Sequence, residues 1–71
     1  MDSYERLANA IVELAVKDYR TALKRVARHP KDRGGLATKN ECERFFRSGW
    51  FGVLTGIDPE TLMRKLQMEV Q

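Results

Sequence analysis

The feature that most constrains the fold is a long run of regularly spaced apolar residues from Ser3 to Arg28. At the roughly 100° per residue of an α-helix, these residues occupy about half of the circumference. They are Tyr4, Leu7, Ala8, Ile11, Val12, Leu14, Ala15, Tyr19, Ala22, Leu23 and Val26. Asp2 or Ser3 can cap the start of this segment, and the basic residues near its end suit the negative end of a helix. We therefore expect one long amphipathic helix with a wide face to bury.

Asp18 departs from this pattern, because its projected direction lies inside the apolar face. An unpaired buried carboxylate is costly, so the residue either pairs with a cation, for which Arg44 or Arg47 is the natural candidate, or lies at the edge of the face in contact with water. No second acid or base accompanies it at a spacing that indicates catalysis.

The small size of the chain predicts one helical domain, residues 1–71, with a thin core. A single cysteine, Cys42, excludes an internal disulfide and a Cys-based zinc site, so contact with another subunit is the remaining way to add apolar burial. We therefore expect a homo-oligomer with the long helix at its interface. The single cysteine, the polar start of the chain and the absence of an apolar run of roughly 18 residues predict a soluble cytoplasmic protein without membrane contact.

The charges are distributed unevenly, since seven basic residues against two acidic ones fall between Lys17 and Arg33. On the expected long helix, a basic stripe lies opposite the apolar face. The stripe consists of Lys17, Arg20, Lys24 and Arg28. It indicates either an acidic partner, such as nucleic acid, a phosphorylated small molecule or an anionic protein surface, or simply a solvated helix surface.

His29-Pro30 ends the first helix, because proline cannot continue the hydrogen-bond ladder. The segment Lys31–Gly35 is typical of a flexible basic loop. It lacks the spacing and the Gly-Lys-Ser/Thr ending of a nucleotide-binding P-loop. His29 is the only histidine, so no metal site is expected.

A second helix is expected from Leu36 to Arg47, with Cys42, Phe45 and Phe46 clustered on its buried side. A different face carries Asn40, Arg44 and Arg47, and the same line continued along a straight helix reaches Phe51, whose ring would then be exposed. Together with the adjacent Trp50, we call these the contact residues: Asn40, Arg44, Arg47, Trp50 and Phe51. Guanidinium, amide and aromatic groups of this kind can bind phosphates, stack on a base or anchor a protein interface. Alternatively, Arg44 and Arg47 pair with Glu41, Glu43 or Asp18.

Ser48-Gly49 is expected to interrupt the helix, with Ser48 as a cap, so that the apolar residues of a short helix at 50–54 all reach apolar surroundings. Thr55-Gly56 ends that short element. Asp58-Pro59-Glu60 then begins a final helix, with one face formed by Leu62, Met63, Leu66 and Val70 and with Met68 outside that face. The fold class predicted is therefore all-α: a small bundle of three main helices with a short extra helical turn, a long N-terminal helix and an oligomeric assembly.

Most of the chain resembles a group of short uncharacterised proteins of phages and mobile elements of Gram-positive bacteria. The segments that carry the resemblance are Ala10–Val12, Ala15–Arg20, Ala22–Arg25, Glu43–Ser48, Trp50-Phe51 and Val53–Thr55. The resemblance implies an accessory gene of a phage or mobile element. Small products of such genes often bind a target, either to regulate transcription or to block a host defence.

These observations predict a non-enzymatic interaction protein that inhibits a host factor, such as a defence component, in the host cytoplasm. It would bind an anionic or nucleic-acid-facing surface or sequester an anionic ligand, without a cofactor or a metal. The basic stripe would supply attraction, and the contact residues would supply directional contacts. The alternative is a small DNA- or RNA-binding regulator whose second helix, with Lys39, Asn40, Arg44 and Arg47, enters a groove. The sequence offers no paired acids and no Cys/His signature for an enzyme.

Overall fold

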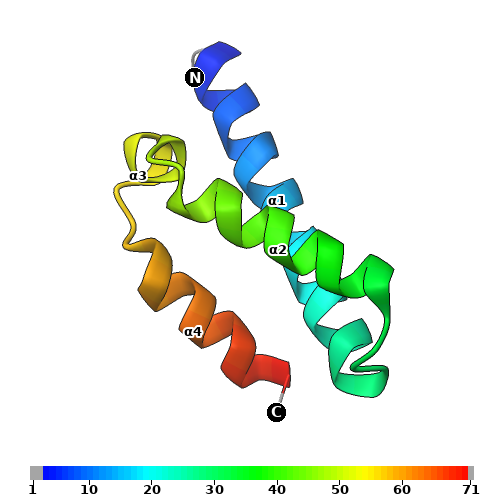
Figure 1. Ribbon diagram of the computed structural model, residues 1–71. Helices are drawn as coiled ribbons and strands as arrows, with labels where there is room; N and C mark the ends of the chain where they lie inside the picture. Colours follow the sequence, from blue (N-terminus) through cyan, green and yellow to red (C-terminus); the bar gives the residue numbers. More distant parts are fainter. Residues whose placement is uncertain (1–2, 71) are drawn as a thin grey trace.

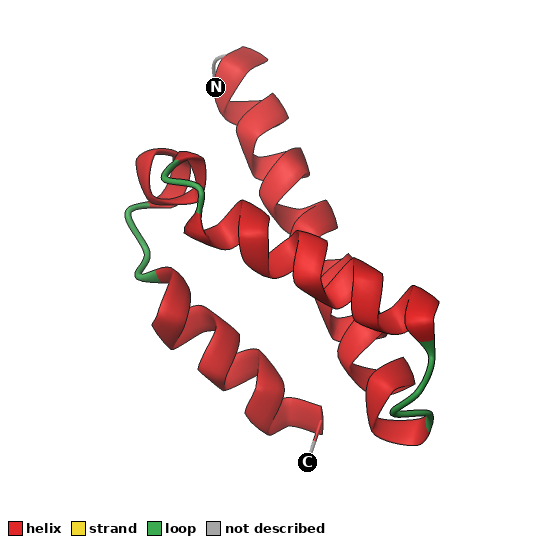
Figure 2. Ribbon diagram, in the orientation of Figure 1, coloured by secondary structure: helices red, strands yellow, loops and turns green. Residues whose placement is uncertain are grey.

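The computed structural model describes residues 3–70, and the side chains of residues 9–70. The described chain contains the helices α1 (Ser3–Arg28), α2 (Arg33–Arg47), α3 (Trp50–Thr55) and α4 (Pro59–Val70) and no strand. The all-α prediction is thus confirmed, with three longer helices and one short one. The connecting loops are short, as Figure 2 shows.

The helices form an elongated bundle that measures 41 × 20 × 19 Å. After the turn at His29-Pro30, α2 returns along α1, and α4 packs against both of them (Figure 1). The small helix α3 caps the end of α2 and also contacts α1. The first turns of α1 extend past α2, so the bundle covers this helix unevenly along its length (Figure 1).

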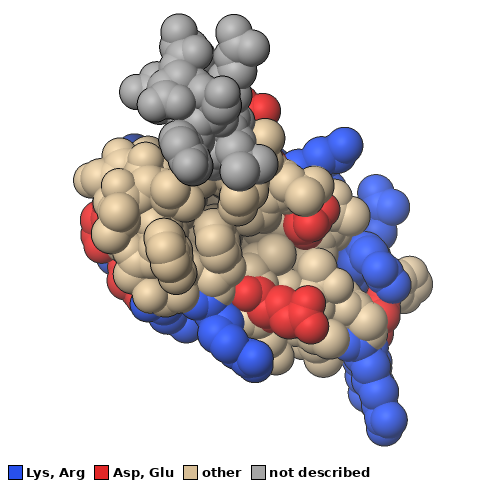
Figure 3. Space-filling model, turned by 90° about the horizontal axis from the view of Figure 1, so that it is seen from above, with Lys and Arg blue, Asp and Glu red and all other residues tan. Residues whose placement is uncertain are grey.

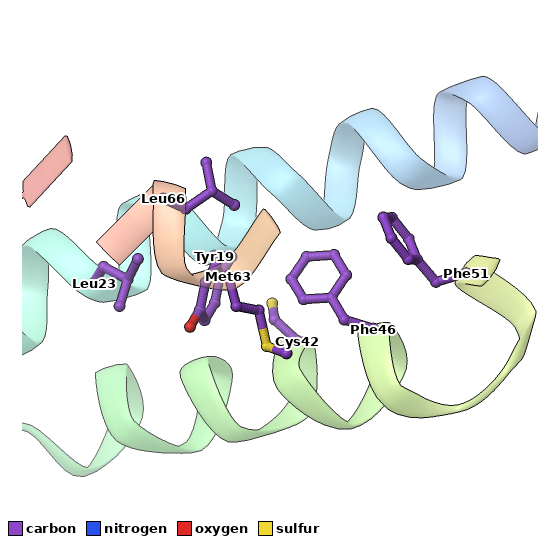
Figure 4. Close-up of a cluster of buried hydrophobic side chains, with 7 residues drawn as sticks. All are labelled: Tyr19, Leu23, Cys42, Phe46, Phe51, Met63 and Leu66. Carbon is purple, nitrogen blue, oxygen red and sulfur yellow. The ribbon is translucent and has the colours of Figure 1, made fainter. Parts of the chain in front are cut away.

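The core contains side chains from all four helices, which point into the space between them (Figure 4). Tyr19, Phe46 and Phe51 are fully buried, and their rings pack edge to face, with Phe46 5.4 Å from Tyr19 and 5.2 Å from Phe51 between ring centroids. The rest of this core is formed by Leu23, Cys42, Met63 and Leu66. The predicted core positions Cys42 and Phe46 are confirmed, whereas Phe45 is only half-buried.

The start of α2 differs from the expectation, because Arg33, Gly34 and Gly35 are helical and not part of a flexible loop. Asp32 is the reason. Its Oδ1 accepts a hydrogen bond from the Gly35 amide at 3.1 Å, and its Oδ2 pairs with Arg25 Nη2 at 2.8 Å. This N-cap satisfies a free amide of the first turn and outweighs the low helix propensity of the glycines.

The break after α2 is confirmed, but its details differ from the prediction. Ser48 ends α2 instead of beginning α3, and its hydroxyl donates to the Phe45 carbonyl at 2.7 Å. Gly49 precedes α3 with φ of +88°, which a residue with a side chain rarely adopts. Of the four apolar residues at 50–54, the structure buries Phe51 and leaves Trp50 and Val53 exposed to 68% and 81%. The prediction that all four reach apolar surroundings is therefore wrong.

The final helix follows the prediction closely. Pro59 is its first residue, and Asp58 Oδ2 accepts hydrogen bonds from the Thr61 amide and hydroxyl. Met63 and Leu66 are buried, and Met68 is exposed. Before it, Gly56 ends α3 in the left-handed conformation.

Among the described side chains, the apolar face of α1 is buried toward its C-terminal end and partly exposed at Ile11 and Leu14. Tyr19, Ala22 and Leu23 are buried, whereas Ile11 and Leu14 are 43% and 59% exposed.

Asp18 is exposed and has no ion-pair partner among the described side chains. Its predicted pairing with Arg44 or Arg47 is therefore wrong, and the alternative, a position at the edge of the apolar face in contact with water, holds.

Candidate functional site

The structure separates the five contact residues that the sequence grouped together. Asn40, Arg44, Arg47 and Trp50 are exposed, whereas Phe51 is fully buried. The turn at Gly49 swings Phe51 inward, where its ring packs on Phe46 and, at 6.4 Å between centroids, on Phe45. The exposed position predicted for Phe51 is therefore wrong, because it assumed that the direction of α2 continues through Ser48.

Arg47 is held by acidic side chains of two helices. It donates from Nε to Glu60 Oε1 at 2.7 Å and from Nη2 to Glu60 Oε2 at 3.3 Å, and its Nη1 lies 3.8 Å from Glu43 Oε1. The hydrogen bond from Arg47 holds the pKa of Glu60 below its ordinary value. The alternative that Arg47 pairs with Glu43 is thus confirmed, and its additional partner Glu60 attaches α2 to the start of α4.

A polar network at the edge of the core was not found from the sequence. The Tyr19 hydroxyl donates to Glu43 Oε2 at 2.9 Å and accepts from Gln67 Nε2 at 2.9 Å, and Lys39 Nζ lies 3.0 Å from the same Glu43 oxygen. Burial raises the pKa of Tyr19 to about 12, assisted by Glu43. Since the network joins α1, α2 and α4, its first effect is to fix how the three helices pack.

Arg44 and Asn40 remain on the outer face of α2. Arg44 has no ion-pair partner among the described side chains, and Trp50 at the start of α3 is largely exposed. These three residues are the part of the contact set that stays accessible to a partner.

The basic stripe lies on the surface of α1, with all four of its side chains exposed. Arg20 is partly neutralised, because it donates to both carboxylate oxygens of Glu69 at 2.9 and 3.2 Å. The hydrogen bonds with Arg20 lower the pKa of Glu69. Within the described part of the chain, Lys17, Lys24 and Arg28 have no such partner.

The C-terminal end of the stripe borders a shallow depression of about 310 Å³. We call it the basic depression, and its lining residues are Thr21, Lys24, Arg25, Arg28 and His29. Sequence reasoning treated Arg25 and His29 only as residues suited to a helix end. The spacing of four positions from Thr21 to Arg25 and from Arg25 to His29 was the signal that could have grouped them on one face. Figure 3 shows Lys and Arg side chains along the right-hand edge of the view and a further group at the lower left, with acidic side chains between them.

The basic stripe and Arg47 contact different acidic residues of α4. Its Glu69 pairs with Arg20 of the stripe on α1, and its Glu60 pairs with Arg47 on α2. The stripe lies on α1 and the accessible contact residues lie on α2 and α3, so we consider them as two separate surfaces.

Among residues 3–70, no group of three or more His, Cys, Asp or Glu side chains is placed to hold a metal ion. In the same part of the chain, none of the helices is long and apolar enough to cross a membrane.

Comparison of the chain with known protein families, curated proteins and solved structures gives no significant match.

Proposed function

We propose that the protein is a non-enzymatic interaction protein that inhibits a partner by occupying an anionic surface of it. The observation that carries this proposal is the row of exposed cations on α1, which ends in the basic depression. Lys24 and Arg28 both border the depression and lack an ion-pair partner among the described side chains, so their charge is directed to solvent. A concave surface with several positive charges attracts anionic groups and orients them.

Arg25 adds a planar group to this surface. Its Nε and Nη2 donate to Asp32 at 3.1 and 2.8 Å, which holds the guanidinium in place at the wall of the basic depression. A fixed guanidinium loses less conformational entropy on binding than a free one. Because the pair with Asp32 neutralises part of its charge, Arg25 shapes the wall of the basic depression, while Lys24 and Arg28 supply the charge that attracts an anionic group.

The biological setting of the proposal rests on the resemblance to short phage and mobile-element proteins. In that setting the partner is a host factor, such as a component of a defence system, in the host cytoplasm. A small protein that covers an anionic or nucleic-acid-facing surface can inhibit such a factor without catalysis. Sequestration of a small anionic ligand in the basic depression would use the same chemistry.

A nucleic-acid-binding regulator is less well supported. In that alternative, α2 enters a groove with Lys39, Asn40, Arg44 and Arg47, but Lys39 pairs with Glu43 and Arg47 pairs with Glu60. Two of the four polar side chains would have to leave these partners before they reached a base or a phosphate.

We also propose that the protein acts as a homo-oligomer. The exposure of Ile11 and Leu14 supports this, because the chain itself leaves part of its longest apolar face in contact with water.

The anion-binding proposal can be tested with two fluorescently labelled probes, an acidic peptide and a DNA duplex, by anisotropy at several salt concentrations. We expect the acidic peptide to bind, and Lys24→Ala/Arg28→Ala to weaken binding by about tenfold. Arg64→Ala/Lys65→Ala is the matched control, because it removes the same charge from exposed positions of α4 outside the stripe. Equal losses in the two variants would mean that only net charge matters. Tighter binding to DNA with a steep salt dependence would favour the regulator instead.

A further inference from the structure

A shallow groove of about 240 Å³ runs between the N-terminal half of α1 and the C-terminal half of α2. Its apolar walls are formed by Ile11, Leu14, Ala15, Cys42 and Phe45. Asp18 and Glu41 add a carboxylate from each helix. This apolar groove is distinct from the basic stripe and the basic depression.

The fold leaves the groove open because α4 packs elsewhere. The contacts of α4 with α1 include Arg20–Glu69 and Tyr19–Gln67, both of which lie in the C-terminal half of α1. In the N-terminal half, Ile11 and Leu14 stay 43% and 59% exposed. Solvent-exposed apolar side chains grouped in a groove mark an interaction surface, in contrast to single exposed ones.

The charges around the groove favour a second copy over an unrelated partner. Glu41 lies in the groove, and Arg44, one helical turn later on α2, is exposed and has no ion-pair partner among the described side chains. A two-fold symmetric interface brings the same surface together twice, so it must be complementary to itself. A surface that carries both an acidic and an unpaired basic side chain beside apolar residues meets that requirement.

We propose that the apolar groove is the interface of a homodimer, in which Leu14 of each copy packs into the groove of the other and Arg44 of each copy faces the acidic side chains of the other. This inference rests on the proposed self-association, which it deepens, and it is independent of anion binding by the basic stripe.

The test is the oligomeric state of the purified full-length chain, measured by sedimentation equilibrium over a range of concentrations. We expect the wild type to form dimers and Leu14→Glu to raise the dissociation constant at least about a hundredfold, because it places a charge in the apolar groove. Met68→Glu is the matched control. Met68 is as exposed as Leu14, at 65% against 59%, but lies on α4 outside the groove, so this variant should dimerise like the wild type.

Circular dichroism should show the same helical content for both variants, since neither residue is buried in the monomer. Arg44→Glu should weaken the dimer less than Leu14→Glu, and the weakening should diminish at high salt. A monomeric wild type at all concentrations would overturn the proposal and leave the groove to another protein. A dimer that survives Leu14→Glu, or one that Met68→Glu disrupts equally, would overturn the assignment to this groove. Binding of the acidic peptide by monomeric Leu14→Glu would show that the two surfaces function separately.

Discussion

The two halves of α1 have the same apolar periodicity but different surroundings. In the C-terminal half, Tyr19, Ala22 and Leu23 are buried against α2 and α4. In the N-terminal half, Ile11 and Leu14 remain exposed in the apolar groove. The difference shows that periodicity predicts which face of a helix is apolar, while the length and position of the other helices decide how much of that face is covered. The buried contacts of α1 are therefore concentrated toward its C-terminal end, and its exposed apolar side chains Ile11 and Leu14 lie closer to the N-terminal end.

The largest expected effect tests this contrast directly by removing one apolar side chain from each region. Phe46→Ala deletes a fully buried ring of the core and should lower the free energy of unfolding by about 3–5 kcal/mol. Ile11→Ala should lower it by about 1 kcal/mol or less in the monomer, because much of Ile11 already contacts water. Urea denaturation at low protein concentration measures both. Similar losses in the two variants would contradict the division of α1 into a covered and an open half.

Tyr19→Phe should have an intermediate effect. It removes the hydroxyl that links Glu43 and Gln67, at a cost of about 1 kcal/mol. The pKa of Tyr19 is raised from 10.0 to about 12 in the folded state. The contribution of the protonated Tyr19 hydroxyl to the stability of the fold is therefore complete below pH 10 and is lost as the pH rises toward 12. Urea midpoints at increasing alkaline pH should fall for the wild type and change less for the variant. An identical alkaline decline in both proteins would exclude Tyr19 as its source.

A smaller effect is expected in acid. Desolvation alone would raise the pKa of Glu43, but hydrogen bonds from Lys39 and Tyr19 and the nearby charges outweigh it and hold this pKa below its ordinary value of 4.5. A depressed folded-state pKa stabilises the protein above pH 4.5, and this stabilisation is lost as the pH falls through the folded-state value. Glu43→Gln should therefore be less stable at neutral pH but lose less stability on acidification, as followed by thermal melts between neutral and acidic pH. The remaining acid sensitivity should come from Glu60 and Glu69 and from the helix caps Asp32 and Asp58, because the pKa values of all four carboxyl groups are also lowered.

The smallest effect separates the two arginines that the sequence treated alike. Arg47→Ala breaks the contacts with Glu60 and Glu43 and should lower the melting temperature by about 2 °C, whereas Arg44→Ala should leave the melting temperature of the monomer unchanged. Differential scanning calorimetry at low protein concentration resolves such a difference. If Arg44→Ala were the more destabilising variant, Arg44 would have a structural role in the monomer and would not be a free contact residue.

Much of the fold could be predicted because its signals are local. The periodicity of α1, His29-Pro30 at its end and Asp58-Pro59 at the start of α4 each act within a few residues, and all are confirmed. The beginning of α2 was missed because the benefit of the Asp32 cap, reinforced by Arg25 from the preceding helix, exceeds the cost that the two glycines suggest.

The candidate site was less predictable because it depends on tertiary placement. Phe51 was assigned to an exposed face by continuing α2 in a straight line, but the positive φ of Gly49 turns it into the core. The pairing of Arg47 with Glu60 spans 13 positions and a change of direction, so no helical spacing could indicate it. Arg44, Asn40 and the basic stripe were placed correctly on the surface, because their exposure follows from the helix pattern alone.

The burial of Cys42 has a practical consequence. This residue is 8% exposed, lies in the apolar groove and carries the only thiol of the chain. Burial raises the pKa of this thiol, so it should react slowly with maleimides even in the open monomer. Any molecule that fills the groove should slow the reaction further. The rate at which a maleimide labels Cys42 therefore measures how much of the groove is occupied. The measurement needs no engineered residue and does not depend on the identity of the bound molecule.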